Sequence, residues 1–291
     1  MLINLLKTMR PRQWAKNGFL FAGLLFDRQL ANLPALLRTV AGFVLFCLLS
    51  GTIYIINDLA DLEADRLHPR KKMRPLPSGK LPVRVAQWAV VILLLIIFPM
   101  AYWLAPEFAI FALLYFLLNL AYSFWIKHVP ILDVLLLASF YVLRVGAGVT
   151  LIHVARFSPW LYVFTTFLAL FLGVGKRRTE LAAIAANGAN VQRRVLDGYT
   201  LPFLDQLNII VSSMTIITYS LYTFSAPNLP DNHAMMLTIP FVIYGIFRYL
   251  YLIQVMQTGE APEEVLFSDR PLQATIFLWG ITILSIFYLS M

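Results

Sequence analysis

The sequence has almost no cysteine and little charge. One of its 291 residues is a cysteine, Cys47, so an intrachain disulfide is excluded. Charged residues make up 13% of the chain, against roughly 25% in a typical soluble domain, whereas 60% are apolar. Such a chain has too little polar material to cover a soluble core. The composition therefore indicates an α-helical protein with several membrane crossings.

Several common catalytic patterns are also missing. The sequence has no Walker loop and no nucleophile elbow, and its four histidines stand apart without metal-ligand spacing. The net charge is +8. In a membrane protein such an excess of positive charge points to anionic lipid surfaces and to topology, so nucleic acid is not expected as a partner.

Apolar runs of about 20 residues mark the expected membrane crossings. We predict nine of them, at approximately residues 17–30, 36–56, 83–104, 108–125, 131–152, 159–174, 207–224, 235–256 and 272–290. The expected fold is an all-α integral membrane bundle of nine helices, forming a single domain over residues 1–291.

The distribution of lysine and arginine predicts the orientation. With the N-terminus inside, 18 of the 23 basic residues lie on the inner side, three lie outside and two lie within crossings. This bias favours an N-in, C-out protein of the inner (plasma) membrane. Two long polar loops, about 57–82 and 175–206, follow crossings two and six on the inner side. They are expected to cap a functional site on the cytosolic face.

The most informative stretch is NDLADLEADRLHPRKKMRPLPSG, residues 57–79. On a continuous helix, Asn57, Asp58, Asp61 and Asp65 would share one face. Carboxylate and amide oxygens suit a hard divalent ion, so these four are the candidate ligands of Mg²⁺, with Mn²⁺ as an alternative. The three aspartates are also the candidate catalytic residues. The competing interpretation is a solvated helix end beside a positive-inside loop.

Basic residues surround this acidic stretch. Arg66, Lys72 and Arg74 follow it and end at turn-forming prolines and a glycine, which indicates a loop that attracts phosphate. Near the N-terminus, Lys16 is the basic residue closest to the first apolar run. It is a candidate phosphate ligand, although the segment 10–16, with Trp14, is equally explained as an interfacial anchor. A metal face followed by a cationic loop indicates a diphosphate site.

The second polar loop opens with the sequence GKRRTEL, residues 175–181. Lys176 and Arg177 emerge nearest the bundle, where a desolvated cation binds phosphate most strongly. Glu180 follows Lys176 by four residues and can pair with it on one helical face. All three are candidate substrate-binding residues.

Two arginines lie inside apolar crossings. A charge at membrane depth is costly and usually faces a cavity or a partner, so Arg144 and Arg248 are candidate substrate ligands. For Arg248 an internal ion pair remains the alternative. Tyr122, Lys127 and Tyr199 are further candidates, since their polar groups can bind phosphate oxygens.

These residues together resemble the UbiA superfamily of membrane prenyltransferases. NDLADLEAD at 57–65 is similar to its first Asp-rich motif, N-D-x-x-D-x-x-x-D. Further similar segments are RPRQWAKN at 10–17, AYSFWIKH at 121–128, GKRRTEL at 175–181 and APEEVLFSDRPLQ at 261–273. The resemblance implies nine transmembrane helices and Mg²⁺-diphosphate bound beneath cytosolic loops.

The second Asp-rich motif of the aromatic prenyltransferases is missing. The closer resemblance is to the branch that transfers 5-phosphoribose from phosphoribosyl pyrophosphate to a polyprenyl (decaprenyl) phosphate and releases pyrophosphate. That branch would serve the synthesis of cell-wall arabinan. An anionic acceptor also calls for cations where a neutral aromatic acceptor does not, which agrees with Lys176 and Arg177 standing in the second loop.

Two other functions remain as alternatives. An aromatic prenyltransferase using an isoprenyl diphosphate would share the fold and the first motif. A lipid-phosphate transporter would also place basic residues near the membrane, but it would not need three aligned aspartates. The expected partners are phosphoribosyl pyrophosphate, polyprenyl phosphate and membrane lipid. The sequence leaves open the prenyl chain length and whether the chain forms a homo-oligomer.

Overall fold

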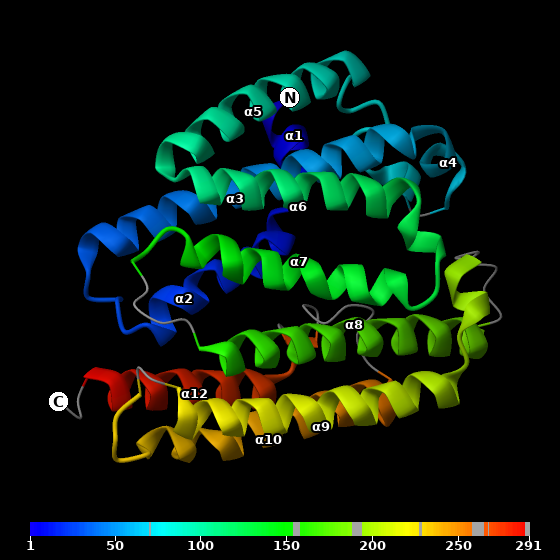
Figure 1. Cartoon of the computed structure of the whole chain (residues 1–291). Helices are drawn as coiled ribbons and strands as arrows, with labels where there is room; N and C mark the ends of the chain where they lie inside the picture. Colours follow the sequence, from blue (N-terminus) through cyan, green and yellow to red (C-terminus); the bar gives the residue numbers. More distant parts are fainter. Residues whose placement is uncertain are drawn as a thin grey trace. The chain divides into compact units, whose positions relative to one another are not determined.

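The computed structural model describes residues 1–69, 71–153, 158–187, 194–226, 229–257, 265–266 and 268–288. Every element within these ranges is helical (Figure 1). The chain divides into two compact units. Unit 1 consists of Met1–Phe124 with Leu143–Val154, and unit 2 consists of Trp125–Val142 with Ala155–Met291. Eight helices in the described part are long and apolar enough to cross a membrane.

Three long helices form the frame of unit 1. They are α3 (Leu33–Ala60), α5 (Val83–Leu104) and α6 (Pro106–Phe124), and each packs against the other two (Figure 1). The Asn32 side chain caps α3 by accepting from the backbone N–H of Ala35, and a proline follows in the first turn. The ring of Phe46 on α3 lies 5.4 Å from that of Phe108 and 5.3 Å from that of Tyr115, both on α6. Aromatic packing therefore joins these two helices.

The first predicted crossing is not one long α-helix. The N-terminal part consists of α1 (Leu2–Thr8), the 3₁₀ helix η1 (Pro11–Leu20) and the short α2 (Phe21–Phe26). The apolar run FLFAGLLF is only eight residues long, and Arg28 shortly after it has a positive φ of 59°. This backbone conformation ends the helix. Residues 17–30 are thus not among the eight helices of membrane-crossing length.

The remaining elements of unit 1 are two short helices and the end of α7. α4 (Leu62–Leu67) and η2 (Lys71–Met73) come directly after α3. The last turns of α7 (Leu132–Val149) also belong to unit 1. There, a Cβ on Gly148 would lie 2.0 Å from the carbonyl oxygen of Leu20, so only glycine allows α7 to approach η1 this closely.

Unit 2 is built on paired helices. α8 (Pro159–Asn187) packs along α9 (Leu201–Ser225), and α10 (Ile239–Gln254) packs against α9 and α12 (Arg270–Tyr288). A buried cluster that includes Phe171, Tyr249 and Ile253 fills the space between them. Short 3₁₀ helices complete the unit: η3 (Ile126–His128), η4 (Arg194–Gly198) and η5 (Ala234–Thr238).

The structure changes the limits of both predicted polar loops. Residues 57–60 belong to α3 and residues 62–67 form α4. Residues 175–187, expected in the second loop, continue α8 without a break. The rest of that loop is described from residue 194 on, and residues 188–193 lie outside the described residues, as do 261–264 and 267 of the C-terminal motif.

Candidate functional site

Two buried aspartates lie where α3 ends in unit 1. Asp58, on the last turn of α3, is 2% exposed, and Asp65, on α4, is 1% exposed. The guanidinium of Arg74 joins them, because its Nη1 lies 3.3 Å from Asp58 Oδ1 and 2.7 Å from Asp65 Oδ2. The structure thus brings two of the predicted metal ligands together with Arg74, a predicted phosphate ligand.

Two further cations, which the sequence analysis did not select, complete this cluster. Arg10 Nη2 donates to Asp58 Oδ1 at 2.6 Å, and its guanidinium lies 4.6 Å from the ring centroid of Tyr54. Lys71 Nζ lies 3.3 Å from Asp65 Oδ1. Arg10 has a positive φ of 52°, at the break between α1 and η1. An arginine just before Pro11 was the available signal, since a residue before proline does not continue a helix.

Asp61 stands apart from this acid–cation cluster. α3 ends at Ala60, so the single helical face predicted for all three aspartates is interrupted, and Asp61 is exposed at the break. Asn57 has a different environment. Its Oδ1 is buried and has no hydrogen-bond partner among the described residues. A buried amide oxygen without a donor is costly unless a ligand satisfies it.

The oxygen atoms of this region fit a hard divalent ion. No group of three histidine, cysteine, aspartate or glutamate side chains in the described ranges is arranged to hold a metal. However, Mg²⁺ commonly takes only one or two carboxylates and completes its shell with water and substrate phosphate. The unsatisfied Asn57 oxygen beside Asp58 matches that preference. The metal-ligand roles of Asn57, Asp58, Asp61 and Asp65 remain predictions.

The other predicted residues at this end of unit 1 are more open to solvent. Arg66 is exposed and pairs with Glu63 on the same helix at 2.7 Å. Lys72 is exposed, whereas Lys16 and Tyr122 are half-buried. Among the described residues, the buried aspartates pair with Arg10, Lys71 and Arg74, so the structure does not bring Arg66 or Lys72 into the acid–cation cluster.

Arg144 forms a separate buried network in unit 1. Its Nε donates to Asn17 Oδ1 at 2.8 Å and its Nη2 donates to Tyr115 Oη at 2.7 Å. Asn17 is fully buried, and its Nδ2 in turn lies 3.3 Å from Cys47 Sγ and 3.2 Å from Ser50 Oγ. Neutral polar groups thus hold this cation inside an apolar span. Asn17, which the sequence analysis did not select, orients Arg144.

A buried ion-pair network lies in unit 2. Arg177 and Asp133 are both fully buried, and Arg177 Nε donates to Asp133 Oδ2 at 2.5 Å. Arg177 Nη1 also donates to Glu180 Oε2 at 2.5 Å. Tyr199 Oη donates to Asp133 Oδ1 at 2.7 Å and accepts from the backbone N–H of Ile131 at 2.5 Å. Arg177 is therefore bound to two carboxylates of its own unit.

Burial, followed by the hydrogen bond to Asp133, raises the pKa of Tyr199. The phenol therefore stays protonated and keeps donating its hydrogen to Asp133 at neutral pH. Two further candidates of unit 2, Lys176 and Lys127, are half-buried. Of the two, Lys176 directly precedes Arg177 on α8.

Arg248 forms an internal ion pair with Asp269, which was the alternative to a role in substrate binding. Its Nη2 lies 2.8 Å from Asp269 Oδ2 and its Nε lies 3.2 Å from Asp269 Oδ1, a bidentate arrangement. Asp269 Oδ1 also accepts from the backbone N–H of Leu272 at 2.8 Å and so caps α12. This geometry gives Arg248 a role in joining α10 to α12.

The hydrogen bond from Arg248 lowers the pKa of Asp269. The contribution of ionised Asp269 to stability is therefore fully present above its unfolded-state pKa, about 3.9. It is lost as the pH falls through the lower folded-state pKa. We expect wild type to unfold at a higher temperature than Asp269→Asn at pH 7, with the difference shrinking as the pH falls below the unfolded-state value. Asparagine keeps the cap, so the comparison isolates the charge. Asp231→Asn, at an exposed acid of the same unit, is the control. A pH-independent difference would contradict the assignment.

The fold and this site define a multi-pass membrane protein with a buried cluster of acids and cations. The chain belongs to the UbiA prenyltransferase family, whose sequence profile matches residues 18–279. It is therefore an enzyme of the transferase class. The predicted all-α membrane fold and the family resemblance are confirmed.

Two curated relatives and one solved structure are similar to the chain. It is 33% identical to the decaprenyl-phosphate phosphoribosyltransferase of Mycolicibacterium smegmatis, over 98% of this chain and 93% of the relative. It is 30% identical to the protein of the same name from Mycobacterium tuberculosis, over 97% and 94%. A solved UbiA homologue from Archaeoglobus fulgidus bound to GPP and Mg²⁺ has the same fold, with a TM-score of 0.73, 21% identity and coverage of 98% and 99%.

Proposed function

We propose that the protein transfers 5-phosphoribose from phosphoribosyl pyrophosphate to a polyprenyl (decaprenyl) phosphate and releases pyrophosphate. Relatives that match nearly the whole chain carry the corresponding name. The observation that carries the proposal is the acid–cation cluster of unit 1, in which Arg10, Lys71 and Arg74 surround Asp58 and Asp65. Such a cluster offers both oxygen ligands for a metal and cations for anionic substrates.

Asn57, Asp58, Asp61 and Asp65 would hold Mg²⁺, or Mn²⁺ in its place. When bound, the ion would neutralise negative charge on the pyrophosphate leaving group. The unsatisfied oxygen of Asn57 and the two buried carboxylates support this assignment. Asp61 would join as the exposed member of the set.

The cations of unit 1 would bind the phosphate groups. Arg10 and Arg74 each retain N–H donors beyond those that contact the aspartates, because a guanidinium carries five. Both side chains are about one-third exposed, at 33% and 32%, so they can reach a ligand from the cluster. We assign Lys16, Arg66 and Lys72 to the same task, with Tyr122 and Arg144 contacting substrate deeper in unit 1.

The chain then needs to position two anions rather than to move a proton. A phosphate monoester is largely ionised at neutral pH, since its second pKa is about 6, so the acceptor oxygen requires no general base. Fixed cations oppose the repulsion between donor and acceptor, and catalysis depends mainly on orientation and electrostatics. In unit 2 we assign Lys127, Lys176, Arg177, Glu180 and Tyr199 to substrate binding, whereas Arg248 pairs with Asp269.

The topology is part of the proposal. We infer nine crossings with N-in and C-out orientation, in which residues 17–30, the end of η1 followed by α2, supply the first crossing. The bias of basic residues, 18 inside and three outside, supports this arrangement. The chain would act as one domain in the plasma membrane, with the polar segments about 57–82 and 175–206 on the cytosolic side above the functional site.

The test is transfer of labelled phosphoribose from phosphoribosyl pyrophosphate to polyprenyl phosphate by the purified full chain in lipid vesicles. We expect Mg²⁺-dependent transfer that stops when EDTA is added. Asp61→Asn should reduce the rate about 10- to 100-fold, the usual range for weakening a metal site. A parallel incubation with an isoprenyl diphosphate and a phenol tests the aromatic prenyltransferase alternative. Full activity of Asp61→Asn would remove this residue from the metal site, and prenylation of the phenol alone would reject the proposed function.

A further inference from the structure

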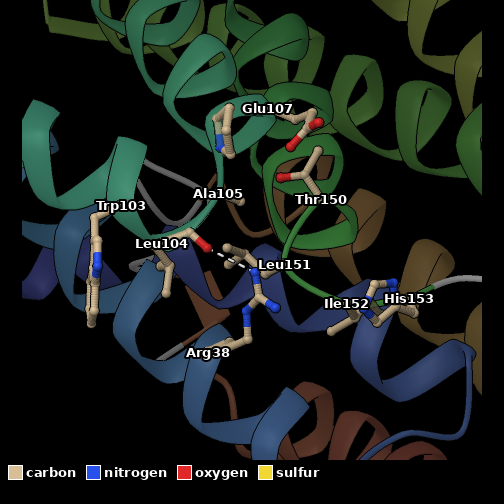
Figure 2. Close-up of a pocket in the computed structure, with 10 residues that line it drawn as sticks. Arg38, Trp103, Leu104, Ala105, Glu107, Thr150, Leu151, Ile152 and His153 are labelled. Carbon is tan, nitrogen blue, oxygen red and sulfur yellow. Dashed lines mark hydrogen bonds between the residues drawn. The ribbon is translucent and has the colours of Figure 1, made fainter.

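A cavity with charged residues on its wall lies in unit 1, away from the acid–cation cluster. Its volume is about 370 Å³. The beginning of α3, the junction of α5 with α6, and the residues after α7 line it (Figure 2). Arg38, which lies on its wall, precedes Asp58 by 20 residues on α3. At a helical rise of about 1.5 Å per residue, the two positions are about 30 Å apart, or one membrane thickness.

Charges of both signs line this cavity. Arg38 comes from α3, Glu107 from the first turn of α6, and Thr150 and His153 from the segment after α7 (Figure 2). Arg38 Nη2 donates to the backbone oxygen of Leu104 at 2.8 Å. This bond fixes the arginine at the cavity and uses one of its five N–H groups, so the others can donate to a ligand.

The wall formed by residues 150–153 is held in place. Ile152 packs in a cluster with Leu24 and Ala35, and Leu151 is 1% exposed. Gln29 Nε2 donates to the backbone oxygen of His153 at 2.8 Å. The cavity is therefore built by fixed backbone on this side, and a ligand would not have to order it.

The position of the cavity along the helices matches the depth of lipid headgroups. It lies where α5 ends at Leu104 and α6 begins at Pro106. Trp103, on its wall, is 85% exposed, and tryptophan at the end of an apolar helix is typical of the membrane–water interface. One turn earlier on α5, the exposed Met100 continues an apolar surface away from the cavity. A bound molecule can thus have a charged head and an apolar tail.

We propose that this cavity binds the headgroup of a zwitterionic glycerophospholipid of the phosphatidylethanolamine type. Arg38 donates to the phosphate, Glu107 accepts from the ammonium, and Trp103 contacts the glycerol and the start of the acyl chains. A free phosphate does not account for the carboxylate of Glu107, and a simple cation does not account for Arg38. A zwitterion satisfies both charges at once.

The test uses the purified full chain after delipidation, with binding followed by native mass spectrometry. Short-chain phosphatidylethanolamine, short-chain phosphatidylglycerol and soluble phosphoethanolamine are titrated separately. We expect phosphatidylethanolamine to bind about tenfold more tightly than phosphatidylglycerol, which has the phosphate but no ammonium; this is the effect of one charge-assisted hydrogen bond. Phosphoethanolamine should bind more weakly than the lipid, because it lacks the apolar tail.

Two substitutions assign the contacts. Arg38→Gln should weaken binding of both lipids about tenfold, whereas Glu107→Gln should weaken only phosphatidylethanolamine and so remove the preference for it. Arg84→Gln is the matched control, since this exposed arginine lies in the first turn of α5, at the other end of the helix from Trp103. If Arg38→Gln does not fold, Arg38→Lys and Glu107→Gln carry the test. Equal binding of the two lipids to wild type, or unchanged binding in both variants, would overturn the proposal.

Discussion

Asp58→Asn is expected to reduce phosphoribosyl transfer at least 100-fold. Asp58 contacts both Arg10 and Arg74, and it directly follows Asn57, whose side-chain oxygen is unsatisfied. Asparagine keeps the shape but removes the negative charge that would hold the metal. Removing one preorganised electrostatic group from an active site costs about 10²–10³ in rate. The measurement is the turnover of labelled donor at saturating polyprenyl phosphate.

The same substitution should leave the protein folded. Arg74 keeps its contact with Asp65, and Arg10 keeps its position over the ring of Tyr54. Both arginines are partly exposed, so water can compensate for the lost partner. Activity and thermal unfolding are therefore expected to separate in this variant.

Glu63→Gln is the control for Asp58→Asn. Glu63 lies on α4, its side chain is 81% exposed, and it pairs with Arg66 at the surface. Loss of its charge should therefore change the rate less than twofold. If Asp58→Asn retained wild-type turnover, the acid–cation cluster would not be the catalytic centre. A comparable loss in Glu63→Gln would indicate a general effect of negative charge near α4.

Asp133→Ala is expected to lower the free energy of unfolding by about 3 kcal/mol, the lower end of the cost of breaking a buried ion pair, because Arg177 loses one of its two carboxylate partners. Here the remaining charge is Arg177, which is fully buried and would be left with Glu180. The hydroxyl of Tyr199 would also lose its acceptor. Thermal or denaturant unfolding of the full chain in detergent measures the effect.

A double variant tests the origin of this loss. In Asp133→Ala with Arg177→Met both fully buried charges are removed, and the remaining Glu180 is 19% exposed and can reach water, so most of the lost stability should return. Asp197→Ala, which removes an exposed acid on η4, is the control and should unfold like wild type. If the double variant were less stable than Asp133→Ala alone, the ion pair would not explain the cost.

Hydropathy predicted most of the fold, and its errors have identifiable causes. The crossing at 83–104 coincides with α5, because Pro82 and Pro106 bound its apolar run. By contrast, α8 continues 13 residues beyond the predicted end at residue 174. The sequence KRRTELAA is polar but consists mostly of strong helix formers. The apolar run therefore ends near residue 174, whereas the helix continues. Hydropathy also does not distinguish a 3₁₀ helix from an α-helix, so the 3₁₀ conformation of η1 was not predicted.

Sequence reasoning grouped candidate residues only where they lie close together along the chain. Asp58, Asp65 and Arg74 fall within 17 residues of each other and were selected together. Arg10 and Asn17 come from the N-terminal segment and reach their partners Asp58 and Arg144 across 48 and 127 residues. Periodicity relates positions within one element, so it cannot identify partners at such separations.

The unbroken course of α8 constrains how this enzyme can vary in length. A helix of 29 residues spans about 43 Å, which exceeds the roughly 30 Å hydrocarbon layer of a membrane. Its last turns therefore extend beyond that layer as a continuous helix and not as a flexible loop. Inserting one residue near its middle would turn every later side chain by about 100° around the axis. Arg177 would then swing away from Asp133, whereas extra residues added after Asn187 would leave that register untouched.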